Sequence, residues 1–195
     1  MVTHDIVVIA ASAGGVSAVA EILQGLPAEF DGSLFVVIHT SPGGPGLLPT
    51  VLDRVTPLTV TNAADGEPIE RGRVYVAPPD RHLVLEHGVV RLSDGPKENY
   101  TRPAADPLFR SAAQHYGSRV VGVILTGGDG DGAAGARAIK EHGGVVIVQE
   151  PAEAQNPSMP RAALLRDHPD LRLQLAEIPC VLVTLSEMPP GALPT

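Results

Sequence analysis

The segment IVVIAASAGGVSAVAE, residues 6–21, decides the fold expected for this chain. Residues 6–9 form an unbroken run of β-branched side chains, which is typical of a strand buried on both faces of a sheet. From Val16 onward the apolar residues recur with the period of an α-helix. Residues 10–15, between these segments, carry no side chain larger than that of serine. The sequence therefore predicts a tight strand-to-helix turn that presents Ser12 to solvent.

Ser12 in this turn has three interpretations. It can be an incidental serine among small residues, the turn can bind phosphate at the helix N-terminus, or Ser12 can be a nucleophile, as in G-x-S-x-G turns. The chain contains no G-x-x-x-x-G-K-[ST] segment, and residues 11–18 do not fit G-x-G-x-x-G. A nucleophilic serine needs a base and an orienting acid from elsewhere in the chain.

Length and composition restrict the function. A chain of 195 residues suits one α/β domain. A net charge of −8 without any Lys/Arg cluster argues against nucleic-acid binding. No apolar run approaches the ~18 residues of a membrane span, and no signal peptide precedes residue 6. The lone cysteine, Cys180, cannot form an internal disulfide. We therefore expect a cytoplasmic protein that does not insert into membranes.

Strands and helices alternate along the rest of the chain, which predicts an α/β fold. We expect three layers, with a mainly parallel, doubly wound sheet and helices on both of its faces. Further strands are expected at 34–38, 58–61, 74–77, 120–125 and 144–149, and helices at 47–54, 108–116, 133–141 and 162–166. Residues 83–92 are predicted to form an antiparallel hairpin that extends one edge of the sheet. Asp106 is expected to cap the helix at 108–116, and residues 179–185 are ambiguous.

Candidate catalytic side chains follow three of the predicted strands. They are Ser12, His39 and the two aspartates Asp129 and Asp131. Because ligands bind at the carboxyl ends of parallel strands, these side chains are expected at one edge. Histidine can take a serine proton, and an aspartate can orient the histidine. Two alternatives stay open: aspartates that only make turns, and a metal-dependent phosphohydrolase that uses both aspartates, although the calcium-loop pattern is incomplete.

Six blocks of the sequence together resemble one protein family. They are VIAASAGG (8–15), VVIHTSP (36–42), YVAPPDRHL (75–83), RPAADPLFRSAA (102–113), LTGGDGDGAAG (125–135) and SMPRAA (158–163). In this order they resemble the catalytic domain of the CheB chemotaxis receptor methylesterases. That family hydrolyses glutamate γ-methyl esters on the cytoplasmic signalling helices of chemoreceptors, and many members also deamidate receptor glutamines.

The resemblance implies a role for each residue of a catalytic triad. Ser12 would attack the ester carbonyl, His39 would accept and return the proton, and Asp131 would orient His39. No metal and no cofactor are expected. The expected partners are methylated chemoreceptor helices, and a separate regulatory protein is left open. Residues 1–188 are expected to be the catalytic domain and 189–195 a tail, without the receiver domain that typical members carry.

Two residues beside this site depart from the family pattern. Ala13 stands where threonine is common, and Gly128 replaces the methionine of the L-T-G-M-G block. The backbone N–H groups of Ala13, Gly127 and Gly128 are expected to form an oxyanion hole, a role that does not need those side chains. The departures nevertheless keep open a non-catalytic regulatory or binding module of the same fold.

Substrate contacts are expected from residues near the same rim. Thr126 and Met159 are expected to contact the substrate side chain, and Leu47, Leu48 and Met159 to dock receptor helices. Because the base must be neutral, the rate is expected to rise with pH through an apparent pKa of ~6.5 that the neighbours of His39 modify.

Overall fold

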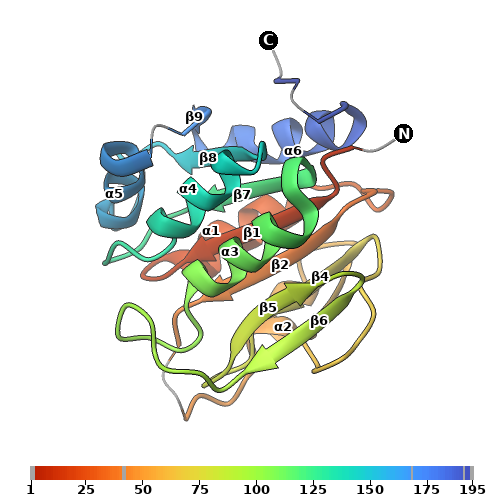
Figure 1. Ribbon diagram of the computed structural model, residues 1–195, viewed down its shortest axis with the longest axis vertical. Helices are drawn as coiled ribbons and strands as arrows, with labels where there is room; N and C mark the ends of the chain where they lie inside the picture. Colours follow the sequence, from red (N-terminus) through yellow and green to blue (C-terminus); the bar gives the residue numbers. More distant parts are fainter. Residues whose placement is uncertain (1–2, 41–42, 168, 191, 194–195) are drawn as a thin grey trace.

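The computed structural model describes residues 3–40, 43–167, 169–190 and 192–193 (Figure 1). Its centre is a seven-stranded sheet in which every pair of neighbouring strands is parallel. Across the sheet, the strand order is β3 (Thr59–Asn62), β4 (Arg73–Val76), β2 (Ser33–Ile38), β1 (Ile6–Ala11), β7 (Val120–Ile124), β8 (Val145–Gln149) and β9 (Leu171–Leu173). All six residues of β1 are buried, as their apolar run predicts.

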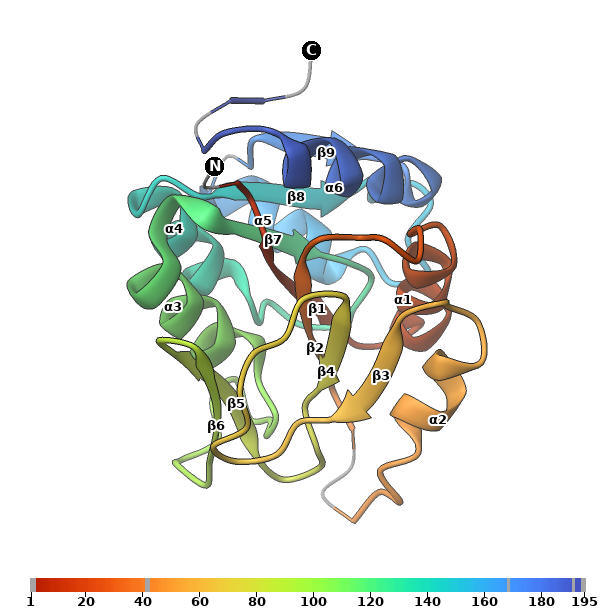
Figure 2. The same cartoon turned by 90° about the vertical axis from the view of Figure 1, so that its right-hand side faces the viewer.

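Helices cover both faces of the sheet, so the predicted three-layer α/β fold is confirmed. One face packs against α1 (Gly15–Gln24), α2 (Leu48–Asp53) and α6 (Ile178–Glu187). The other face packs against α3 (Ala105–Tyr116), α4 (Ala133–Glu141) and α5 (Ser158–Asp167). Figure 2 shows α3 and α4 on one side of the strands and α1 and α2 on the other. Two 3₁₀ turns, Gly117–Arg119 and Leu175–Glu177, complete the described elements.

The predicted hairpin is present, but it does not extend the main sheet. Strands β5 (His82–Glu86) and β6 (Val89–Ser93) pair with each other in a two-stranded antiparallel sheet that is separate from the main sheet, and an isolated bridge joins Val89 to Pro68. Leu83, Leu85 and Val90 bury their side chains in the core that contains α3, and the N–H of Leu85 donates to Ser111 Oγ of that helix. The hairpin therefore adds to the helical layer, because its apolar face packs on a helix.

The chain direction across the sheet places the candidate residues together. From β1 the chain proceeds to β2 on one side, and β7 returns to the other side of β1. The carboxyl ends of β1, β2 and β7 thus meet at the point where the strand order reverses, the place where open α/β sheets bind ligands. None of the described helices is long and apolar enough to cross a membrane.

Candidate active site

The turn that carries Ser12 is fixed at both of its ends. The Ser12 N–H donates to the carbonyl oxygen of Thr126 at 2.9 Å, and the Gly15 N–H donates to that of Ser12 at 2.8 Å. Gly14 has a φ of +79°, and a Cβ there would lie 2.4 Å from Gln155 Oε1. Glycine is required here by both backbone angle and space. The turn leaves Ser12 half-buried beside an exposed Ala13.

His39 and Asp131 form a buried pair. His39 Nε2 lies 2.7 Å from Asp131 Oδ2, with the histidine side chain 9% exposed. Asp131 also accepts the N–H groups of Ala105 at 2.5 Å and Asp106 at 3.1 Å, the first two residues of α3. Burial alone would raise the pKa of Asp131, but the hydrogen bonds from His39 and Ala105 outweigh it and lower that pKa. Asp131 is therefore a carboxylate at neutral pH.

Asp131 also does what the sequence predicted for Asp106. Asp106 lies inside the first turn of α3, and its Oδ1 accepts the N–H of Gly135 from α4 at 2.7 Å. The free N–H groups at the start of α3 are bonded instead by Asp131. The predicted cap at Asp106 is thus wrong, because Asp131, which is distant in sequence, accepts the N–H groups at the start of the helix.

Asp129 contacts the second nitrogen of His39. Its Oδ2 lies 3.2 Å from His39 Nδ1, and its Oδ1 accepts the N–H of Asp131 at 3.0 Å. Burial would lower the pKa of His39, but the hydrogen bonds to Asp129 and Asp131 and their charges raise it to about 9. The neighbours of His39 thus move its pKa well above the starting value of ~6.5, because two carboxylates contact the imidazole. Among the described residues, no hydrogen bond joins His39 to Ser12.

The three backbone groups expected in the oxyanion hole are not equivalent. The N–H of Gly127 donates to the carbonyl oxygen of Asn156 at 2.9 Å. Within the described part of the chain, the N–H groups of Ala13 and Gly128 donate to no acceptor. A Cβ at Gly127 would lie 3.0 Å from Ser12 Cβ and 1.9 Å from Met159 Sδ. Gly127 thus makes room for Ser12, and Ala13 and Gly128 are better placed to bind an oxyanion.

Thr126 and Met159 are buried side chains that pack beside the Ser12 turn. They are 2% and 1% exposed, respectively. Thr126 Oγ1 donates to the carbonyl oxygen of Ala13 at 2.9 Å and accepts the N–H of Asn156 at 2.9 Å. Met159 occupies the space that a side chain at Gly127 would need. Both side chains thus expose almost no surface in the free protein, and their contact with the substrate stays a prediction.

Asn99 is a site residue that the sequence did not reveal. Glu98 and Thr101 exchange two backbone hydrogen bonds, which closes a tight turn with Asn99 and Tyr100 at φ values of +49° and +64°. The Asn99 amide donates to Asp131 Oδ1 at 2.8 Å and to Asp106 Oδ2 at 3.0 Å. Asparagine tolerates a positive φ, the only local signal that marked this turn.

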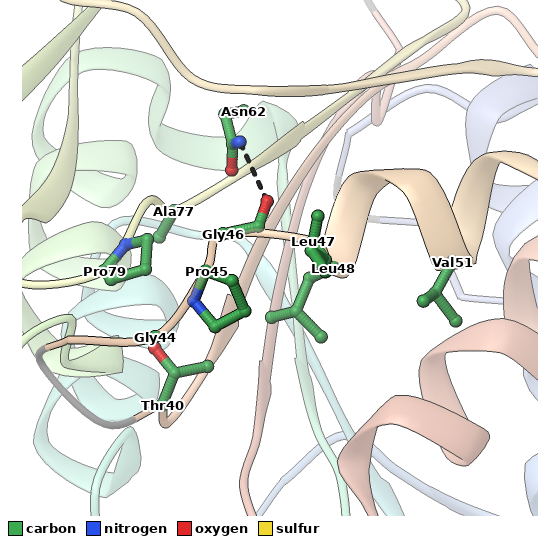
Figure 3. A pocket seen from close by; sticks show the side chains of 10 residues that line it. All are labelled: Thr40, Gly44, Pro45, Gly46, Leu47, Leu48, Val51, Asn62, Ala77 and Pro79. Atoms are coloured by element: carbon green, nitrogen blue, oxygen red, sulfur yellow. Dashed lines mark hydrogen bonds between the residues drawn. The ribbon is translucent and has the colours of Figure 1, made fainter.

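An apolar cavity of about 350 Å³ has Thr40, the residue that follows His39 in the chain, in its lining (Figure 3). Its lining residues are Thr40, Gly44, Pro45, Gly46, Leu47, Leu48, Val51, Asn62, Ala77 and Pro79. Asn62 Nδ2 donates to the carbonyl oxygen of Gly46 at 3.1 Å, the dashed line in Figure 3. Leu47 and Val51 are 58% and 47% exposed. Leu47 and Leu48 thus border an open apolar surface, whereas Met159 is buried.

Both aspartates of the loop after β7 contact His39. This arrangement argues against the alternative in which they would hold a metal ion in a phosphohydrolase. Asp131 contacts Nε2 and Asp129 contacts Nδ1. Among the residues that the structure describes, no three His, Cys, Asp or Glu side chains are grouped so that they can hold a metal ion. The positions of the two carboxylates favour proton transfer through His39 over phosphohydrolase chemistry.

Residues 7–182 match the CheB methylesterase family. The chain belongs to this family. A protein-glutamate methylesterase/protein-glutamine glutaminase of Anaeromyxobacter dehalogenans is 44% identical over 182 residues, 93% of this chain and 53% of that protein. A relative from Leptospira interrogans is 36% identical, over 94% of this chain and 96% of its own length. The chain thus spans about half of the first relative and nearly all of the second.

The fold agrees with a solved structure of the CheB family. The crystal structure of the Thermotoga maritima CheB methylesterase catalytic domain superposes with a TM-score of 0.88 and 37% sequence identity. The match covers 93% of this chain and 98% of the Thermotoga chain. The family expected from the six sequence blocks is confirmed.

Proposed function

We propose that this chain hydrolyses γ-methyl esters of protein glutamates, with Ser12 as nucleophile, His39 as base and Asp131 as the orienting acid. The buried His39–Asp131 pair at the same sheet edge as Ser12 carries the proposal. Within the described residues the Ser12 hydroxyl takes part in no hydrogen bond, so it is free to meet a substrate. The proposed substrates are methylated cytoplasmic helices of chemoreceptors, and the proposed location of the chain is accordingly the cytoplasm.

The proposed reaction has two stages. Ser12 Oγ attacks the ester carbonyl while His39 accepts its proton, and the N–H groups of Ala13 and Gly128 stabilise the oxyanion. His39 returns the proton to the departing methoxide, so methanol leaves and an acyl-enzyme remains. Water then cleaves the acyl-enzyme by the same route and yields glutamate. A glutamine side chain would form the same acyl-enzyme and release ammonia.

Methanol release from a methylated receptor fragment tests this function. The purified chain is expected to release methanol, and a fluorophosphonate is expected to label Ser12, since labelling needs an activated serine. A folded chain that neither releases methanol nor reacts with the fluorophosphonate would instead be a non-catalytic module of the same fold.

The apolar cavity predicts a separate effect on substrate binding. The double variant Leu47→Ser/Val51→Ser is expected to raise KM for the receptor fragment about tenfold, since about 1.4 kcal/mol of lost burial gives that factor. Hydrolysis of a small ester such as p-nitrophenyl acetate should not change. Leu165→Ser is a matched control, because Leu165 is 83% exposed and does not line this cavity. Equal KM values for the double variant and the wild type would exclude docking at this surface.

A further inference from the structure

His39 lies between two carboxylates that come from one loop. Asp131 Oδ2 is 2.7 Å from its Nε2, and Asp129 Oδ2 is 3.2 Å from its Nδ1. A carboxylate at each nitrogen favours the form of imidazole that carries a proton on both. A histidine in that form cannot accept the proton of Ser12. The free site therefore holds its candidate base in the state that cannot start the reaction.

The two carboxylates differ in how firmly they are held. Asp131 is 1% exposed and accepts N–H groups from Ala105, Asp106 and Gly132 in addition to the Asn99 amide. The Asp129 side chain is 37% exposed.

Asp129 also has fewer ties to its surroundings. Among the described residues, its second oxygen accepts only the backbone N–H of Asp131, and glycines flank it on both sides, Gly128 and Gly130. Glycine backbone rotates with little steric restriction. Asp129 is thus held in place less firmly than Asp131, and it is the carboxylate that can move away from His39.

We propose that Asp129 is a positioning residue that occupies Nδ1 of His39 in the free site and leaves when the substrate binds. Without that carboxylate the pKa of His39 falls, and its Nδ1 proton is released to solvent water. Nδ1 can then accept the Ser12 proton while Asp131 stays on Nε2. This inference rests on the proposed function, and it adds that the base becomes available only with substrate in place. It accounts for the missing Ser12–His39 hydrogen bond among the described residues.

Few other charged groups near His39 could hold it in the protonated form. Asp129 and Asp131 are the charged groups that shift its pKa. Asp106 of α3 lies near Asp131, burial raises its own pKa, and it is not among the groups that shift the pKa of His39. Arg110 of the same helix pairs with Glu98 at 2.7 Å. From the other side, Thr101 presents only an uncharged hydroxyl, 3.4 Å from Nε2.

NMR titration of the His39 imidazole nitrogens in the free protein tests the first half of the proposal. In the wild type, His39 is expected to stay protonated up to a pH of about 9. Asp129→Asn, and Asp129→Ala as a second variant, should lower this midpoint by at least one unit. Asp94→Asn removes an 80%-exposed carboxylate away from His39 and should leave it unchanged. An unchanged His39 midpoint in both Asp129 variants would overturn the proposal.

Kinetics with a methylated receptor fragment test the second half. The profile of kcat/KM reports the free enzyme and that of kcat the enzyme–substrate complex. In the wild type, kcat/KM should therefore rise at a higher pH than kcat, and in Asp129→Asn the two midpoints should coincide. At pH 7 the variant should gain about tenfold in kcat/KM, because each unit of pKa changes the neutral fraction tenfold.

The outcomes separate this inference from the proposed function. Coincident wild-type midpoints, or an Asp129→Asn variant that is slow at every pH, would overturn the role of Asp129 even if methanol is released. If no variant releases methanol but the NMR midpoint falls in Asp129→Asn, the proposed function fails, while the effect of Asp129 on the protonation of His39 stands.

Discussion

Ser12→Ala is expected to lower the rate of methyl-ester hydrolysis by several orders of magnitude, because it removes the one atom that forms the acyl-enzyme. Folding should be nearly unaffected. Ser12 is half-buried, its hydroxyl takes part in no hydrogen bond within the described residues, and its neighbours Ala11 and Ala13 show that alanine suits this turn.

Methanol release measures this effect, and thermal unfolding checks the fold. Ser17→Ala is a matched control, since Ser17 is exposed on α1, five positions after Ser12. It should keep the full rate. If Ser12→Ala retained more than a tenth of the wild-type rate, Ser12 would not be the nucleophile, whatever the family resemblance implies.

The central strands are the part of the fold that the sequence predicts best. β1, β2, β7 and β8 are buried along their whole length, so their apolar runs are unbroken. β9 has three residues, none of them fully buried, and gives no such signal. The position of the hairpin was also beyond prediction, because local alternation defines a pair of strands but not the element on which the pair packs.

In the candidate site, too, the sequence predicts features that follow from the strands but not contacts that depend on tertiary packing. Ser12, His39 and Asp131 could be found because each follows a strand and parallel strands end at one edge. The contact between Asp129 and His39 depends on the path of a glycine-rich loop. The burial of Met159 depends on how α5 meets Gly127. Neither is encoded in a short motif.

The environment of Asp131 makes its replacement the most informative change in the loop after β7. Asp131→Asn keeps the shape of the side chain but removes the charge that pairs with His39. The new amide nitrogen would also face the N–H groups of Ala105 or Asp106, donors that need an acceptor. We expect a rate loss of roughly 10³–10⁴, since the asparagine favours the wrong imidazole tautomer.

The same substitution should also lower the free energy of unfolding by about 2–4 kcal/mol, because it leaves buried N–H donors without an acceptor and removes one of the two carboxylates that pair with His39. The two shifted pKa values predict how the free energy of unfolding changes with pH. The raised pKa of His39 stabilises the fold below its unfolded value of ~6.5, and this contribution is lost as pH rises through about 9. The lowered pKa of Asp131 contributes stability above ~3.9, which is lost on acidification.

Urea unfolding across this pH range, with methanol release at saturating substrate, separates Asp131 from Asp129. Asp131→Asn should lose the rate and much of the fall in stability between about pH 6.5 and 9. Asp129→Asn should keep activity, because the carboxylate it removes leaves His39 during the reaction. Equal, large losses of rate in both variants, together with a wild-type rate that a chelator abolishes and a divalent ion restores, would favour the metal-dependent alternative. Each aspartate would then be a metal ligand. The two substitutions would lower the rate equally, although Asp131 is buried and Asp129 is partly exposed.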